Sequence, residues 1–408
     1  MGAGAPDERA LSLPPIPLAR PDVGEAEAEA ARRVLLSGWL AQGPQVAAFE
    51  AEFAAHVGAA QAVAVCNATA ALELVLHALG LGPDDEVVTV SHSFIATANA
   101  VRRTGALPVF ADIESGGFNI DPASVAAAIG PRTRAVLAVH QMGMPCDLTA
   151  LARISEAHGL PLIEDAACAA GSEVLSDGRW RRIGRPRGLA ACFSLHPRKL
   201  LTTGEGGMIT TADEALAKRL RRLRTHGADL DAAARRHVGV VEERYLEPGF
   251  NMRMTDVQAA IGRVQLARLP QMVARRRELA RDYAGRLAAA APDVGLPREP
   301  AWARSNWQSF CVTLPEGVGQ GAARIALAAR GVASRRGIKC AHREPAYPPG
   351  TWACAPGRGR CDCAGPRCTR LGRSERAQDR SLLLPLYNQM TEADLDRVTE
   401  ALVAACRS

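Results

Sequence analysis

One lysine of this chain lies among residues suited to covalent chemistry. Lys199 follows Ser194 and His196 and precedes a Gly-rich turn. A lysine amine beside hydroxyl, imidazole and small residues can form a Schiff base with an aldehyde cofactor. Upstream, the apolar run at 162–166 predicts a buried strand that ends at Asp165. A carboxylate there can keep a pyridine nitrogen protonated, so the two residues predict pyridoxal phosphate (PLP) as the cofactor.

Two further segments supply other parts of a PLP site. Residues 66–72 follow a predicted strand and open a predicted helix. Small residues there let backbone N–H groups approach a phosphate, with the Thr69 hydroxyl as a further donor. Phe94 follows the next predicted strand and can stack on the pyridine ring. Each residue also has an ordinary interpretation, since Thr69 and Asp165 can cap helices and Phe94 can be a core residue.

These residues must be positioned by a sheet with alternating helices. Short apolar runs alternate with amphipathic stretches, which is typical of an α/β fold with a mostly parallel sheet. The predicted strands are Ala62–Val65, Glu86–Val90, Leu107–Phe110, Ala135–Val139, Leu160–Ile163, Ala190–Phe193 and Gly207–Thr211. Predicted helices include Ala70–Leu79, Asp121–Ala128 and Asp147–His158.

The chain is long enough for two domains, which is the expectation at 408 residues. We expect a large cofactor domain at 1–270, with a helical N-terminal arm over 22–60. A long helical stretch after Thr255 leads into a smaller C-terminal α/β domain at 271–408. Within the smaller domain, the Gly-, Pro-, Arg- and Cys-rich segment 345–373 indicates an insertion or long loop.

Composition and charge narrow the function classes. The chain is 48% hydrophobic and 23% charged, as in ordinary globular proteins, and it has no apolar run of membrane-spanning length. The N-terminus lacks a secretory pattern, so we expect a cytoplasmic protein without a membrane partner. Residues 331–380 carry eleven Arg or Lys and four Asp or Glu. Because no aromatic platform accompanies them, we expect no nucleic acid, and an anionic small substrate fits instead.

Four of the eleven cysteines form a group near the C-terminus. Their spacing departs from the paired C-x-x-C knuckles of structural zinc sites. We therefore expect no metal, and reduced thiols in a loop. A zinc clip, with Cys340 or His342 as an added ligand, is the alternative. The four residues are Cys354, Cys361, Cys363 and Cys368.

Taken together, the motifs resemble the DegT/DnrJ/EryC1/StrS family of PLP-dependent sugar aminotransferases, which have the aspartate aminotransferase fold (fold type I). The resemblance runs nearly end to end. It is carried by the stretches at 37–44, 67–72, 105–112, 163–167, 194–199, 203–207 and 249–256.

The resemblance implies a role for individual residues. Lys199 would form the Schiff base and Asp165 would face the pyridine nitrogen. Phe94 would stack on the ring. The other cofactor-binding positions are Ala68, Thr69, Ala70, Cys168, Ser194, His196 and Asn251. Substrate contacts are expected from His342, Arg335 and Arg253, and Arg336, Lys339 and Arg343 are further candidates for an anionic group.

The chain departs from the family pattern at two positions, and the resemblance also implies an oligomeric assembly. Ala68 stands where the family usually has Gly, and Cys168 stands where it usually has Gln or His, near the phenolic oxygen of the cofactor. The family's counterpart of Asn251 reaches the phosphate from a neighbouring subunit, which implies a homodimer with shared active sites.

The activity that the resemblance implies is amino transfer from glutamate or glutamine to a keto-sugar. Lys199 is retained, whereas a branch of the family with His at this position dehydrates its substrate instead. A nucleotide-linked sugar in amino-sugar or secondary-metabolite (antibiotic) biosynthesis is the first expectation. The alternatives are a cyclitol ketone or free aminoglycoside-type precursor, and a PLP-binding regulator without turnover.

Overall fold

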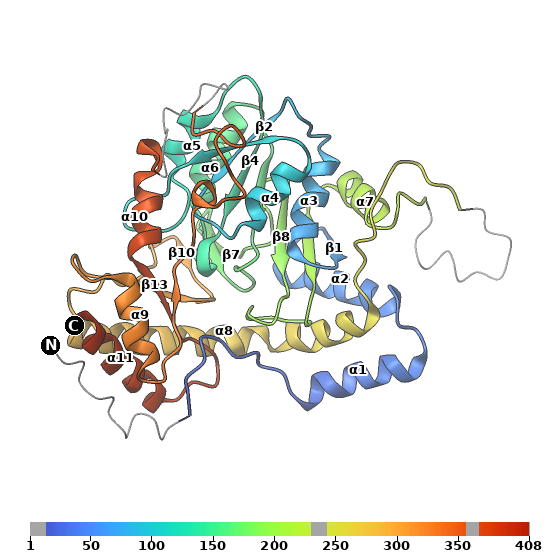
Figure 1. Cartoon of the computed structure of the whole chain (residues 1–408). Helices are drawn as coiled ribbons and strands as arrows, with labels where there is room; N and C mark the ends of the chain where they lie inside the picture. The colour runs from blue at the N-terminus through green and yellow to red at the C-terminus, as the bar shows by residue number, and fades with distance from the viewer. Residues whose placement is uncertain (1–13, 230–242, 356–366, 408) are drawn as a thin grey trace.

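The computed structural model describes residues 14–229, 243–355 and 367–407 (Figure 1). A seven-stranded sheet with the order β1-β9-β8-β5-β4-β2-β3 forms its centre. Only β9 runs antiparallel to its neighbours. The strands are β1 (Gln61–Val65), β2 (Glu86–Val90), β3 (Leu107–Ala111), β4 (Thr133–Val139), β5 (Leu162–Asp165), β8 (Ala190–Ser194) and β9 (Gly207–Thr211).

Helices cover both faces of this sheet because successive strand residues point to opposite sides. Val88 and Val90 belong to one apolar cluster, whereas Val87, the residue before Val88, belongs to the other. The first face packs against α2 (Pro44–Val57), α5 (Pro122–Ala128), α6 (Leu148–Ala157) and the start of α8 (Asp256–Ala290). The second face packs against α3 (Ala68–Ala78), α4 (Ala96–Arg103) and α7 (Glu214–Leu223).

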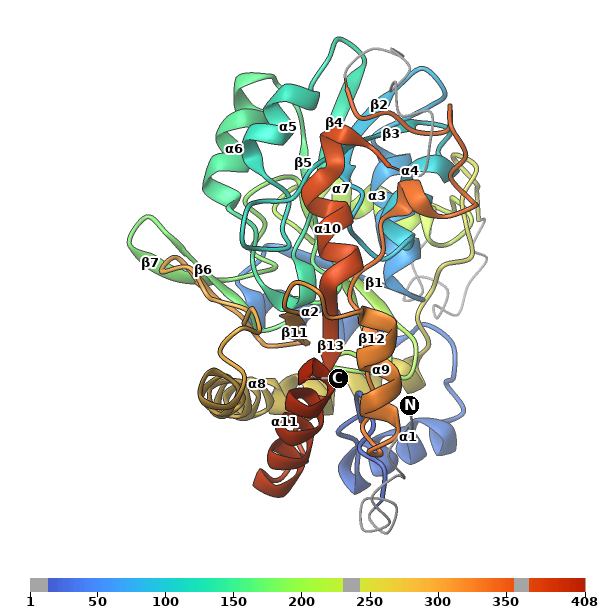
Figure 2. The ribbon, with the colours of Figure 1, turned by 60° about the vertical axis from the view of Figure 1, so that its left-hand side comes forward.

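A second core lies around the C-terminal half of α8 (Figure 2). There a three-stranded sheet with the order β11-β13-β12 packs with two helices, and Tyr283 stacks on Phe310 at 4.6 Å between ring centroids. The elements are β11 (Phe310–Thr313), β12 (Arg335–Arg336), β13 (Ser381–Leu384), α9 (Gln320–Ala328) and α11 (Glu392–Arg407).

Smaller elements connect these parts. A three-stranded ribbon has the order β10-β6-β7, and α10 precedes β13. Their bounds are β6 (Glu173–Ser176), β7 (Arg179–Arg182), β10 (Ala303–Arg304) and α10 (Gly372–Arg380). Single turns of 3-10 helix lie at Gln141–Gly143, Ala341–Arg343 and Thr369–Leu371.

The long helix α8 has 35 residues and runs beneath the sheet into the second core (Figure 1). Thr255 caps its first turn and Gln258 completes the capping box. The helix α1 (Glu25–Ser37) lies against it. The domain division that we propose at residue 270 falls inside α8, a helix that contributes side chains to both cores.

The predicted α/β class is confirmed, with seven strands in the expected segments. Some strand bounds differ by up to two residues: β5, for example, begins two residues later than predicted and includes Asp165 as its last residue. The helical stretch 22–60 consists of two helices, and α1 ends where the Ser37-Gly38 pair predicts a stop, with a left-handed backbone at Gly38 (φ 75°). None of the described helices has the length and hydropathy needed to cross a bilayer.

Candidate active site

The predicted catalytic residues meet at one edge of the large sheet. Asp165 is the last residue of β5, and Ser194 is the last residue of β8. Gly207 opens the antiparallel strand β9 and pairs with Ser194. Ligands of α/β folds bind at the carboxyl ends of the parallel strands. The topology therefore brings these segments to the edge where a cofactor is expected.

Asp165 is buried, with 5% of its surface exposed. Thr97 Oγ1 donates a hydrogen bond of 2.8 Å to Asp165 Oδ2, and the Ala167 N–H donates one of 3.1 Å to Oδ1. Burial raises the pKa of the Asp165 carboxyl, while these two hydrogen bonds act in the opposite direction. A buried carboxylate needs a cationic partner, which a protonated pyridine nitrogen provides.

Thr97 is a residue to which the sequence analysis gave no role. It lies in α4, three residues after Phe94, and its hydroxyl also contacts Ser93 Oγ at 2.8 Å. The segment that presents the predicted ring-stacking residue thus also fixes the orientation of Asp165. Phe94 itself is 68% exposed, which leaves its ring surface open for stacking.

Lys199 lies in the loop between β8 and β9. Its Nζ donates a hydrogen bond of 3.0 Å to Cys168 Sγ. The loop is closed by backbone hydrogen bonds, including Lys199 N to His196 O at 2.8 Å and Leu195 N to Gly206 O at 2.8 Å. The amine is therefore held against the turn that follows Asp165.

His196 orients this loop. Its Nδ1 accepts a hydrogen bond of 3.1 Å from the Arg198 N–H, and its Nε2 lies 4.0 Å from Glu205 Oε1. Burial lowers the pKa of the His196 imidazole. The hydrogen bond from Arg198 ties the imidazole to the backbone of the lysine loop, which supports a role for His196 in orienting that loop.

Two amide side chains from the segment before β11 clamp the lysine and cysteine loops. Gln308 Oε1 accepts from Leu200 N at 2.9 Å, and its Nε2 donates to Arg198 O at 2.6 Å. Asn306 Nδ2 donates to Cys168 O at 2.9 Å and to Ala170 O at 2.8 Å. Neither residue belongs to a recognisable motif, so the sequence alone does not predict these contacts.

The segment predicted to cradle the phosphate lies at the N-terminus of α3. Asn67 caps the helix by accepting from Ala70 N at 2.8 Å, which leaves the earlier N–H groups of the first turn without an intrahelical acceptor. A Cβ on Gly207 would lie 2.5 Å from Asn67 O and 2.9 Å from Ala68 N. Only glycine permits this close approach, so the cradle fits a phosphate held by backbone N–H groups.

The remaining cofactor and substrate candidates differ in their surroundings. Asn251 is exposed and Arg253 is half-buried. His342 is buried, with Nδ1 at 2.6 Å from Ser91 Oγ and Nε2 at 3.0 Å from Glu375 Oε1. Both ring nitrogens of His342 therefore have protein partners. A cofactor or substrate contact by any of these three residues stays a prediction.

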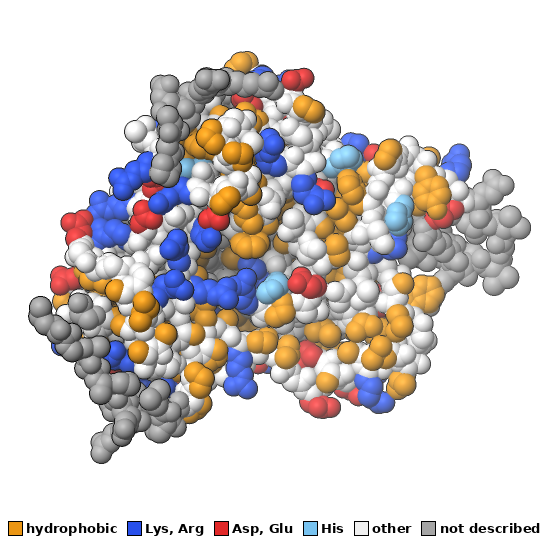
Figure 3. Space-filling model, in the orientation of Figure 1, with side chains coloured by type: hydrophobic (Ala, Val, Ile, Leu, Met, Phe, Trp, Pro, Cys, Tyr) orange, Lys and Arg blue, Asp and Glu red, His pale blue; other side chains and the backbone are white. Residues whose placement is uncertain are grey.

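The basic residues near position 340 flank, in sequence, a bridge to the segment that carries Phe94. Arg335 and Arg336 are exposed on β12, whereas Lys339 pairs with Glu344 at 3.1 Å. Cys340 forms a β-bridge with His92, two residues before Phe94. In Figure 3, Lys and Arg side chains gather beside the hollow in the middle of the visible face. Arg343 pairs with Asp379 at 2.8 Å.

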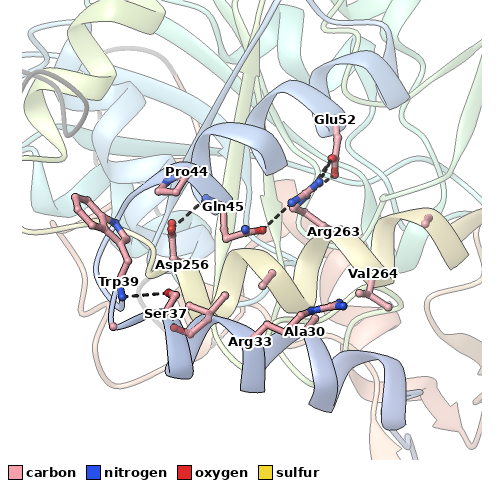
Figure 4. Close-up of a pocket in the computed structure, with 14 residues that line it drawn as sticks. Ala30, Arg33, Ser37, Trp39, Pro44, Gln45, Glu52, Asp256, Arg263 and Val264 are labelled. Atoms are coloured by element: carbon pink, nitrogen blue, oxygen red, sulfur yellow. Dashed lines mark hydrogen bonds and ion pairs between the residues drawn. The ribbon is translucent and has the colours of Figure 1, made fainter. Parts of the chain in front are cut away.

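A cavity of about 840 Å³ lies elsewhere, between α1, the start of α2 and the start of α8 (Figure 4). Asp256 caps α2 there by accepting from Gly43 N at 2.8 Å and Val46 N at 3.0 Å. Arg263 binds Glu52 at 2.7 Å on the other side of the cavity. These groups bind one another, and we assign them a structural role.

The structure describes only two of the four cysteines of the possible zinc site, Cys354 and Cys368. Cys361 and Cys363 lie outside the described residues. Within the described ranges, no group of three or more His, Cys, Asp or Glu side chains is arranged to hold a metal ion.

Comparisons with known proteins identify the family of this chain and structures with a similar fold. The family model of the DegT/DnrJ/EryC1/StrS aminotransferases matches residues 21–403. The aminotransferase TlmJ from Streptoalloteichus hindustanus is 35% identical, with a TM-score of 0.84 over 96% of this chain and 99% of that one. DesV from S. venezuelae, solved in complex with a ketimine intermediate, is 34% identical, with a TM-score of 0.83 over 97% and 100%.

A third structure, DesI in the presence of its TDP-sugar product, is 34% identical, with a TM-score of 0.82 over 96% of this chain and 93% of that one. The family match covers most of the chain, and the neighbours share the arrangement of the large sheet and its helices. This chain therefore belongs to the DegT/DnrJ/EryC1/StrS aminotransferase family, whose enzymes use pyridoxal phosphate.

Proposed function

We propose that the protein transfers an amino group from glutamate or glutamine to a keto-sugar carried on a nucleotide, in amino-sugar biosynthesis. The observation that supports this best is the placement of Lys199 and the buried Asp165 at one sheet edge, beside the N-terminus of α3. An amine, a buried carboxylate and a phosphate cradle are the parts that PLP-dependent amino transfer requires.

The surroundings of the amine, the carboxylate and the phosphate cradle suit each of them to a specific role. The bound PLP supplies an electron sink for the carbon that loses or gains the proton. In our proposal Asp165 holds a proton on the pyridine nitrogen, while Thr97 fixes the carboxylate. The first turn of α3 and Ser194 hold the phosphate. Lys199 Nζ binds the cofactor and then moves the proton as a general base.

The nucleotide-linked substrate is supported by charge. Arg335 and Arg336 are exposed on β12, shortly before Cys340, which bridges to the segment that carries Phe94. A guanidinium binds phosphate oxygens with two parallel hydrogen bonds. DesI, one of the similar structures, was solved with a TDP-sugar product. We extend that substrate class to this chain as part of the proposal.

We also propose a homodimer with shared active sites. Leu35 and Leu36 at the end of α1 are exposed by 56% and 72%, and Leu40 beyond it by 48%. A cluster of exposed leucines is costly in water and is typical of a surface that another chain covers. Exposed Asn251 is then able to reach the phosphate of a partner's site.

Borohydride reduction of the purified protein tests the cofactor assignment. It should fix the cofactor to Lys199, which peptide mass mapping would locate. An adduct on another amine would contradict the proposed site. Lys199→Ala should lower kcat by at least about a hundredfold, the scale of a lost general base.

A panel of ketones tests the substrate. With glutamate as donor, we expect conversion of a nucleotide-linked keto-sugar and not of a cyclitol ketone or a free aminoglycoside-type precursor. The reverse preference would establish the alternative substrate. If glutamate and glutamine both leave the aldehyde form of the cofactor unchanged, amino transfer from the proposed donors is wrong.

A further inference from the structure

Two cysteines far from Lys199 in the sequence have their thiols in contact. The Cys354 S–H donates a hydrogen bond to the Cys368 sulfur. Cys354 is 6% exposed and Cys368 is 1% exposed, in an apolar cluster that includes Phe110 and Tyr347. The hydrogen bond lowers the pKa of the Cys368 thiol and raises that of Cys354. Cys368 is thus the better nucleophile of the two.

The backbone on the Cys354 side is fixed to the large sheet. Ala353 N donates to Pro108 O at 3.0 Å, and Ala353 O accepts from Phe110 N at 2.7 Å. The residue before Cys354 therefore extends the sheet beside β3, as a parallel bridge to Val109 confirms. This pairing fixes the backbone immediately before Cys354.

The backbone on the Cys368 side is fixed by a different element. Cys368 N donates to Glu375 Oε1 at 2.5 Å, and Leu371 N donates to Cys368 O at 2.9 Å. Glu375 lies in α10 and binds His342 with the same oxygen. Two separately anchored segments thus bring the two sulfurs within hydrogen-bonding contact.

We propose that Cys354 and Cys368 form a reversible disulfide when the protein meets a low-molecular-weight disulfide such as oxidised glutathione. Because both thiols are buried, the step requires local opening of the apolar cluster that covers them. The Cys368 sulfur then attacks one sulfur of the oxidant and expels one thiolate. The Cys354 sulfur then gives up its proton, attacks Cys368 and expels the second thiolate. The protein loses two electrons and two protons, and the oxidant leaves as two thiols.

The bond would tighten a network that reaches the active-site edge. From Cys368 the hydrogen bonds run through Glu375 and His342 to Ser91 Oγ. Ser91 begins the segment in which Ser93 contacts Thr97. Because the cross-link joins two separate positions of the chain, it should also restrict the unfolded chain and stabilise the fold.

Peptide mapping of the holoenzyme tests the proposal. Trypsin separates the candidate cysteines, since Cys354 is on 344–358, Cys361 and Cys363 are on 361–367, and Cys368 is on 368–370. After treatment with oxidised glutathione, we expect two of the eleven thiols to be lost and 344–358 to be joined to 368–370. Dithiothreitol should reverse both changes. The oxidised form should have a Tm a few degrees higher than the reduced form.

Matched variants complete the experiment. Cys354→Ser with Cys368→Ser should abolish the cross-link and the Tm rise, whereas Cys361→Ser with Cys363→Ser should keep both. A cross-link to 361–367, glutathione retained on Cys368, or one zinc per chain that prevents oxidation would each overturn the proposal. Peptide mapping of the unsubstituted protein distinguishes these outcomes even if a variant fails to fold.

Discussion

At the scale of single residues, the site depends on how Asp165 and Lys199 are held. Thr97 and Ala167 fix the two oxygens of Asp165, and Cys168 accepts from the Lys199 amine. The types and order of the reactive pair are visible in the sequence. The role of the Thr97 hydroxyl is not, because only the turn after β2 brings it to a carboxylate 68 residues away in sequence.

Thr97→Val should move the acidic limb of the pH dependence of kcat/KM upward. The hydrogen bond from Thr97 lowers the pKa of Asp165 in the native protein, so its removal raises that pKa further. Asp165 then loses its charge at a higher pH as the solution is acidified. A net hydrogen bond of about 1 kcal/mol corresponds to a shift of roughly 0.7 pH units.

Thr89→Val is the control for this change. Thr89 Oγ1 donates to Leu137 O at 2.8 Å and is similarly buried, but its hydroxyl bonds to a backbone oxygen instead of Asp165. The substitution should lower Tm and leave the acidic limb in place. An unmoved limb in Thr97→Val would show that Thr97 does not tune Asp165.

Cys168→Gln should lower the pH midpoint of the cofactor's absorbance change. A thiol is a poor hydrogen-bond donor, whereas an amide N–H can stabilise the anionic phenolic oxygen that the family resemblance places at this position. The phenolic oxygen of the cofactor then attracts the proton that it shares with the Lys199 nitrogen less strongly. Spectrophotometric titration of the holoenzyme measures the midpoint. An unchanged value would contradict the position of Cys168 beside the phenolic oxygen.

At the scale of elements, the sequence predicts the sheet edge that carries the site. It does not predict the side chains of Gln308 and Asn306 that hold the loops at this edge. Alternating apolar runs predict the seven strands and place Asp165 at a strand end, whereas the candidate role of Ser194 comes from the family resemblance. Gln308 and Asn306 come from the segment before β11 and reach back by more than 100 residues. No periodicity or motif predicts such a tertiary hydrogen bond from one sequence.

Gln308→Leu should lower kcat by roughly 10- to 100-fold, because loss of the clamp lets the Lys199 loop shift from the reacting geometry. Its effect on KM should be small. Steady-state kinetics and Tm of the holoenzyme measure both properties.

Gln320→Leu is a matched control for the clamp. Gln320 Nε2 also binds two backbone oxygens, Gln378 O at 2.9 Å and Ser381 O at 2.6 Å, in the smaller core. It should cost comparable stability without the loss of kcat. Equal kcat for the two variants would refute a positioning role for Gln308.

At the scale of the whole molecule, exposed leucines on α1 bear on assembly. Leu36→Glu should shift the protein from dimer to monomer, because it places a charge in the proposed subunit interface. Light scattering during gel filtration measures the mass. Ile325→Glu is the control, since Ile325 on α9 is 73% exposed, close to the 72% of Leu36. A Leu36→Glu dimer as stable as the parent would contradict the proposed surface.

The helix α8 determines how far the two halves of the molecule depend on each other. Met272 and Val273 pack in the core of the large sheet, whereas Tyr283 belongs to the second core, together with Ile16 from the N-terminal segment. Cutting the chain at residue 270 would therefore remove apolar side chains from both cores. It would also separate the Lys199 loop from Gln308 and Asn306. We expect neither fragment to be an autonomous folding unit, so the enzyme gains or loses its structure as a single cooperative body.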